Sequence, residues 1–228
     1  DFWRIVGRGL VVCAVFGLSV DMHAQTSWIG DVLIQRLPDG QAYAEVQTAW
    51  TSKAETASDS LTLTMIVFQG DDIVSFQKDN VLARPEVQDS SALRHVHVAR
   101  LAVPHGGLRV EWLVAQHDMP LWRHNASVRV PMGGIPEFTD VMVVNTHAPA
   151  TARSQPNMVH SGLDLIPKVG NTIPVEATSA RLYVELHGLN EVVPTDSLFL
   201  FKFGWADEQG QWNPRATRYL RKASAPIV

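Results

Sequence analysis

Residues 61–68 read LTLTMIVF, and this stretch decides the fold class. Leu and Thr alternate through its first half, so an extended chain has one apolar face and one face that carries hydroxyl groups. Alternation with a period of two is typical of a half-buried β-strand. Gly70-Asp71-Asp72 follows as turn sequence and leads into a further strand pattern at 73–78 (IVSFQK). The stretch therefore predicts strand, turn and strand.

Similar patterns recur along most of the chain. The runs 93–103 and 108–116 flank Pro104-His105-Gly106-Gly107, and two such runs around a glycine-rich turn predict a hairpin. No segment after residue 28 shows a sustained helical period. Short strands at regular spacing indicate β-sandwiches. Further strands are predicted at 41–50, 126–130, 138–145, 162–167, 180–187, 197–203 and 212–219.

The segment Pro131-Met132-Gly133-Gly134 marks a domain boundary, because Pro and two Gly follow a strand pattern. Each side is near the ~100 residues of an immunoglobulin-like sandwich. The predicted fold is all-β, with two tandem immunoglobulin-like or fibronectin-like β-sandwiches at 28–130 and 131–228. One continuous sandwich across both halves is the alternative.

Residues 1–25 have the layout of a signal peptide. Arg4 and Arg8 provide a basic start, residues 9–20 (GLVVCAVFGLSV) are apolar, and a small polar stretch follows. The apolar run is shorter than the roughly 20 residues of a membrane-spanning helix, which disfavours an uncleaved anchor. Cys13 lies inside this run, so it does not match a lipidated cysteine at the end of one. We expect an exported chain in the periplasm or cell envelope of a Gram-negative bacterium.

The composition supports a globular exported protein. Hydrophobic residues make up 46% and charged residues 18% of the chain. Removal of residues 1–25 also removes the only cysteine, and an exported domain without disulfides favours a bacterial envelope protein. The net charge of −4 and the lack of a Lys/Arg-rich block argue against nucleic acid as a partner. No other segment is apolar enough to suggest a membrane span.

Three stretches in the second half carry a resemblance to a known family. They are 138–141 (FTDV), 161–167 (SGLDLIP) and 182–189 (LYVELHGL), and the run at 106–116 adds a matching hairpin pattern. Their order resembles the β-sandwich region that precedes the Gly-Trp-x-Thr-Asp domain in a family of Gram-negative envelope proteins. The naming motif itself is absent, since residues 204–207 read GWAD. The resemblance implies an exported β-sandwich protein and carries over no catalytic residues.

His95-Val96-His97 is the sharpest candidate metal site. Residues i and i+2 of a strand share a face, so both imidazoles could bind one ion if a third ligand joined them. The alternative is that both histidines line a solvated face beside Arg94 and Arg100, with Val96 and Val98 in the core.

Trp122, Arg123 and His124 form a candidate binding site in a predicted loop at 118–124. An exposed aromatic ring beside Arg and His could stack on a sugar or fill a pocket of a partner. The alternative is a loop tryptophan folded back onto the edge of the sandwich.

The sequence predicts a function other than catalysis. No Gly-x-Ser-x-Gly elbow and no phosphate-binding loop is present, so we expect no enzyme and no cofactor. The expected function is a protein-interaction or scaffold module that holds an envelope protein by its loops or by an edge strand. The alternatives are a carbohydrate-binding module that uses Trp122, or a metal-dependent enzyme built on His95 and His97.

Overall fold

A computed structural model describes residues 27–37, 39–52, 60–82, 87–89, 92–132, 136–173, 176–194, 197–204, 209, 211 and 218–223. The predicted signal peptide at 1–25 lies outside these residues. The described residues form antiparallel β-structure with one helix of four residues, α1 (Leu189–Val192), and one 3-10 turn (Pro156–Met158). The prediction of an all-β fold is confirmed.

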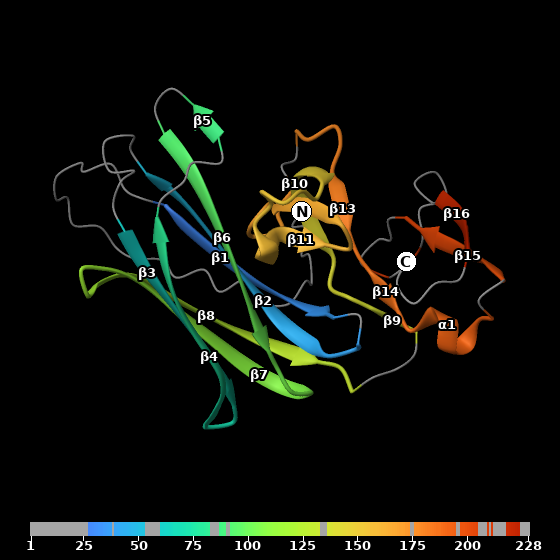
Figure 1. Ribbon diagram of the computed structural model, residues 1–228, viewed down its shortest axis with the longest axis horizontal. Coiled ribbons are helices and arrows are strands. Elements are labelled where there is room, and N and C mark those ends of the chain that lie inside the picture. The colour runs from blue at the N-terminus through green and yellow to red at the C-terminus, as the bar shows by residue number, and fades with distance from the viewer. Residues whose placement is uncertain are drawn as a thin grey trace.

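The first half of the chain forms two four-stranded sheets that pack as a β-sandwich (Figure 1). One sheet has the order β1-β2-β6-β5, and the other has the order β4-β3-β7-β8. The sheet edges approach each other where β1 lies near β8 and β4 lies near β6. The strands are β1 (Trp28–Arg36), β2 (Ala42–Ser52), β3 (Ser60–Gln69), β4 (Asp72–Leu82), β5 (Val87–Asp89), β6 (Ala92–Ala102), β7 (Gly106–Gln116) and β8 (Met119–Val130).

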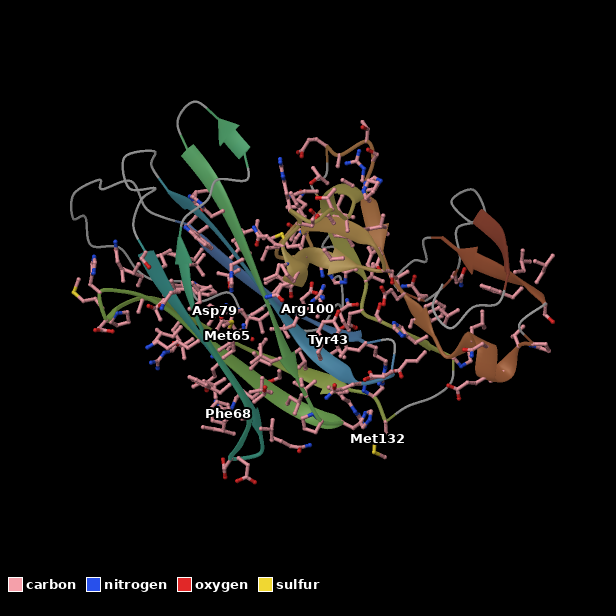
Figure 2. All side chains as sticks on the ribbon, viewed as in Figure 1. Tyr43, Met65, Phe68, Asp79, Arg100 and Met132 are labelled. Carbon is pink, nitrogen blue, oxygen red and sulfur yellow. The ribbon has the colours of Figure 1, made fainter. Side chains whose placement is uncertain are left out.

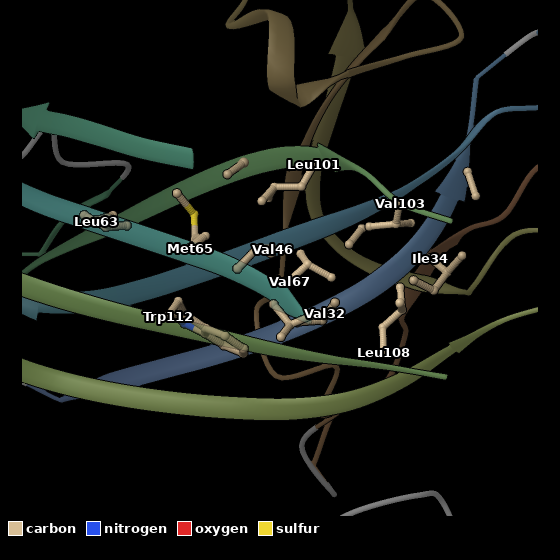
Figure 3. Packing of buried hydrophobic residues seen from close by; sticks show 14 of the residues in the cluster. Val32, Ile34, Val46, Leu63, Met65, Val67, Leu101, Val103, Leu108 and Trp112 are labelled. Atoms are coloured by element: carbon tan, nitrogen blue, oxygen red, sulfur yellow. The ribbon is translucent and has the colours of Figure 1, made fainter. Parts of the chain in front are cut away.

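The main hydrophobic core lies between these sheets, and β3 shows how the sequence builds it. Leu61, Leu63, Met65 and Val67 are buried, whereas the residues that alternate with them are partly exposed. This is the alternation predicted from LTLTMIVF. Figure 3 shows the buried side chains of β3 facing those of the opposite sheet, including Val46. Complete burial of such a side chain contributes about 1.5–3 kcal/mol.

The predicted hairpin of 93–103 and 108–116 is wrong. β6 pairs with β2 and β5, whereas β7 pairs with β3 and β8, so the chain crosses from one sheet to the other at residues 103–105. Both strands bury one face, as Leu101 and Leu108 show. Two strands with one apolar face each can be neighbours in one sheet or can face each other across a core. Turn composition does not distinguish the two arrangements.

The predicted loop at 118–124 is also wrong, because β8 begins at Met119. His117 and Asp118 form a two-residue turn, with φ angles of 49° and 62°. Two consecutive positive φ angles are typical of the type I′ turn that joins antiparallel strands. Pro120 is tolerated here because β8 is the edge strand of its sheet.

The second half of the chain, yellow to red in Figure 1, forms smaller sheets. One has the order β11-β12-β10-β13, and two pairs, β14-β9 and β15-β16, are two-stranded. A second tandem sandwich over 131–228 stays a prediction. The strands are β9 (Glu137–Phe138), β10 (Met142–Pro149), β11 (Val159–His160), β12 (Leu163–Pro167), β13 (Arg181–Tyr183), β14 (Leu186–His187), β15 (Leu198–Phe203) and β16 (Arg218–Ala223).

Two predicted strands of this half are interrupted at positions that lie opposite each other. The runs 138–145 and 180–187 lie antiparallel, but each is divided between two sheets. At the break, Thr139 N donates to Glu185 O, and Glu185 N donates to the Thr139 hydroxyl. Glu185 lies at this break and is buried, with its side chain 9% exposed.

Candidate functional site

The second half of the chain covers the outer face of the β1-β2-β6 sheet. Leu33 of β1 packs against Met142, Val144 and Leu165, which form a second, smaller hydrophobic cluster. Ile34 N donates to Asp140 Oδ2 at 2.7 Å, so a side chain of the second half caps the backbone of β1. These contacts join the two halves by apolar packing and by hydrogen bonds.

A fully buried carboxylate, that of Glu45 on β2, lies at this junction. The register of the sheet places Arg100 of β6 beside Glu45, and the Arg100 Nε lies 3.4 Å from Glu45 Oε2. His160 approaches from the second half, with its Nε2 3.1 Å from the same oxygen. Gln47 donates to the other oxygen at 2.9 Å. A buried charge requires such partners, because its transfer from water costs several kcal/mol.

Arg100 links the two halves directly. Its Nη2 donates to the carbonyl of Val159 at 3.0 Å and lies 2.9 Å from His160 Nε2. Its guanidinium lies over the ring of Tyr43, 5.2 Å from the centroid, and Figure 2 labels both residues where the sandwich meets the second half. Burial raises the pKa of the Tyr43 phenol well above its usual value, so Tyr43 is neutral at any physiological pH.

The Glu185 carboxylate accepts hydrogen bonds from three side chains. Ser161 donates to Oε1 at 2.6 Å, Tyr183 donates to the same oxygen, and His187 Nε2 lies 2.7 Å from Oε2. Burial opposes ionisation, but these hydrogen bonds outweigh it and lower the pKa of Glu185 to about 2. A carboxylate with so low a pKa is a weak general base at neutral pH. The arrangement is better suited to holding structure than to moving protons.

We call the residues around Glu45 and those around Glu185 together the junction cluster. The ring of Tyr183 lies 5.4 Å from that of His160, which brings them together. The cluster was not predicted from the sequence. Its only sequence signal is in 41–50 (QAYAEVQTAW), where Tyr, Glu and Gln alternate with apolar residues and predict a strand with a polar second face. Its members are Tyr43, Glu45, Arg100, His160, Ser161, Tyr183, Glu185 and His187.

His95 and His97 share a face of β6, as predicted, but the face is the inner one. The His95 ring is 1% exposed and stacks on Trp50 at 5.1 Å, whereas His97 Nε2 lies 2.9 Å from Asp79 Oδ2 on β4. The alternative expectation of a solvated histidine face is therefore wrong, whereas Val98 is buried as that alternative expected and Val96 is only partly buried. Among the described residues, no three His, Cys, Asp or Glu side chains are placed to hold a metal ion.

Trp122 and His124 point inward from β8, and Arg123 points outward. The Trp122 ring stacks on His124 at 5.3 Å and on Trp28 at 6.1 Å, and Trp112 contacts its edge at 5.9 Å. Because β8 is extended, the three predicted binding residues do not form one surface. Trp122 is engaged with protein rings, and only Arg123 and His124 are exposed.

The outer face of the β4-β3-β7-β8 sheet carries exposed apolar side chains. Ile73 is 61% exposed and Phe76 is 59% exposed, and the register pairs them with Phe68 and Ile66. Arg109 lies 4.2 Å over the Phe68 ring and forms an ion pair with Glu111. We call this surface the open face. Its members are Thr64, Ile66, Phe68, Ile73, Phe76, Lys78, Arg109, Glu111, Leu113 and Arg123.

Two shallow hollows lie on the surface of the described residues. One of about 240 Å³ lies at the junction and is lined in part by Arg36, Arg129 and Glu137. The other, about 120 Å³, lies on the open face between Thr64, Leu113 and Arg123. Pockets for small molecules usually enclose about 300–1,000 Å³, so neither hollow has the size of such a site.

Comparisons with protein-family models, with curated proteins and with solved structures found no match. The resemblance to the Gly-Trp-x-Thr-Asp family stays a prediction. In the part of the chain that the structure describes, no helix has the length and hydrophobicity that a membrane span requires.

Proposed function

We propose that this chain is an exported, non-catalytic module of a bacterial cell envelope that binds a protein partner. One observation carries the proposal: the two sheets of the sandwich have different outer faces. The chain covers the first with its own second half, through Leu33 and the junction cluster. The second, the open face, exposes Ile73 and Phe76.

Exposed apolar side chains that are adjacent to one another mark a binding surface in a folded protein. Ile73 and Phe76 are neighbours of Phe68 and Ile66, so these four side chains form one patch across β3 and β4. The shallow hollows favour a protein over a small molecule, because flat surfaces bind proteins and deep pockets bind small ligands. The signal-peptide pattern at 1–25 supports an envelope partner.

The test is a cross-linked pull-down of the tagged mature chain from its native envelope, with mass spectrometry of the recovered proteins. The double variant Ile73→Ser/Phe76→Ser removes the patch, and Met119→Ser is its control, because Met119 is 66% exposed but lies at the β7-β8 turn. We expect one dominant protein partner that is lost with the double variant and kept with the control. Recovery of the same proteins with the wild-type chain, the double variant and the control variant would overturn the proposal. Recovery of glycan alone would also overturn it.

A further inference from the structure

The open face carries a positive charge on an acidic chain. Three cations, Lys78, Arg109 and Arg123, point outward from it, and the only carboxylate beside them among its members is that of Glu111. Glu111 is paired with Arg109, and the whole chain has a net charge of −4. Within the described residues, neither Lys78 nor Arg123 forms an ion pair. Both cations are exposed and available to a partner.

These two cations end one row that runs across the sheet. The register pairs Lys78 with Thr64, Thr64 with Leu113, and Leu113 with Arg123. The last three of these residues line the hollow of about 120 Å³, so it lies in the row between the two charges. The rest of its lining is Ile66, Trp112 and Glu111, and the charge of Glu111 is paired with Arg109. The row therefore consists of a cation, a shallow hollow with Leu113 in its lining, and a second cation.

The spacing of the row matches an extended peptide. Lys78 and Arg123 are three strand spacings apart, which is about 14 Å at ~4.8 Å per strand. Four residues of extended chain span nearly the same distance at ~3.4 Å per residue, and side chains i, i+2 and i+4 point to the same side. A carboxylate, an apolar side chain and a second carboxylate at these positions would meet the two cations and the hollow.

We infer that the open face binds an extended acidic segment of the protein partner, with the pattern carboxylate-x-apolar-x-carboxylate. This inference rests on the proposed function and names the partner chemistry. The exposed Ile73 and Phe76 favour a peptide over an anionic polysaccharide, because they offer apolar contacts that a sugar chain does not use fully. Charge complementarity at the rim of an apolar patch sets specificity and the rate of encounter.

The test uses the purified full chain to select peptides from a phage-displayed library of random 12-residue sequences. We expect enrichment of Asp or Glu at positions i and i+4 around an apolar residue at i+2. A synthetic peptide of the selected sequence should bind about tenfold more weakly to Arg123→Glu and more weakly as salt rises. Arg153→Glu is the matched control, because this substitution changes the net charge by the same amount. Arg153 is exposed and lies in the second half of the chain.

Each other outcome overturns the inference. If the selected peptides have no excess of acidic residues but their binding still requires Ile73 and Phe76, the proposed function would stand and the acidic partner would be ruled out. If no peptide is selected but the chain binds phosphatidylglycerol vesicles, and this binding requires Arg123, the face would be assigned to a membrane surface. Self-association that Ile73→Ser/Phe76→Ser abolishes would assign it to a second copy of the chain. Failure to bind peptide, vesicle or a second copy, together with a pull-down that recovers no partner, would remove both proposals.

Discussion

Glu45 Oε2 and His160 Nε2 lie 3.1 Å apart, although the two residues come from different halves of the chain. Glu45 is fully buried on β2, and His160 is 5% exposed on β11. Arg100 lies between the halves and contacts both residues. One buried carboxylate and its two partners therefore add to the apolar packing and the hydrogen bonds that attach the second half to the sandwich.

Replacement of that carboxylate should destabilise the protein strongly. Glu45→Gln keeps the size of the side chain but leaves the partly buried Arg100 without its counter-charge. Breaking a buried pair costs about 3–5 kcal/mol, and the partial exposure of Arg100 places the expected loss at the lower end of that range. Urea unfolding at neutral pH measures the loss. Glu111→Gln is the control, because its partner Arg109 is exposed and surface pairs contribute about 0–1 kcal/mol. Equal stability of the two variants would show that the Glu45 contacts do not join the halves.

The low pKa of Glu185 predicts a dependence of stability on acid. Because the pKa of the folded protein, about 2, lies below the ordinary value of 4.5, the ionised carboxylate stabilises the fold above pH 4.5. That contribution, about 3 kcal/mol in all, is lost as the pH falls from 4.5 towards 2. We expect the free energy of unfolding of the wild-type chain to fall over this range, and that of Glu185→Gln to fall less steeply. An identical acid slope for both proteins would contradict the hydrogen-bond network.

The strands of the sandwich could be predicted where the residues alternate along one segment, as in β3. The pairing of strands could not, because the apolar faces of β6 and β7 are satisfied by either of two partners. Likewise, the sequence identified His95 and His97 as sharing a face, but which face is buried depends on the sheet opposite. The junction cluster was missed because Glu45 and His160 meet only through tertiary contacts, and no local pattern relates their positions.

Gly30 should tolerate no side chain. A Cβ on Gly30 would lie 2.7 Å from ring atoms of both Trp112 and Trp122, so these indoles occupy the space that any other residue would need. Gly30→Ala should therefore cost about 1–3 kcal/mol through overpacking and should alter the tryptophan fluorescence. Gly107→Ala is the matched control, because Gly107 also lies in a strand but has no atoms near its Cβ position. A neutral Gly30→Ala would show that the tryptophan cluster has room to move.

His97 and Asp79 offer a direct test of how the two sheets meet at their edge. Burial lowers the pKa of His97 below 6.5, although the hydrogen bond and charge of Asp79 oppose that effect. Neutral His97 is therefore favoured in the fold, so this residue removes stability as the pH falls from 6.5 through its folded pKa. In an NMR titration, His97 should titrate below 6.5 in the wild-type chain and lower still in Asp79→Asn. A rise in the pKa of His97 in that variant would show that Asp79 does not face the imidazole across the sheet edges.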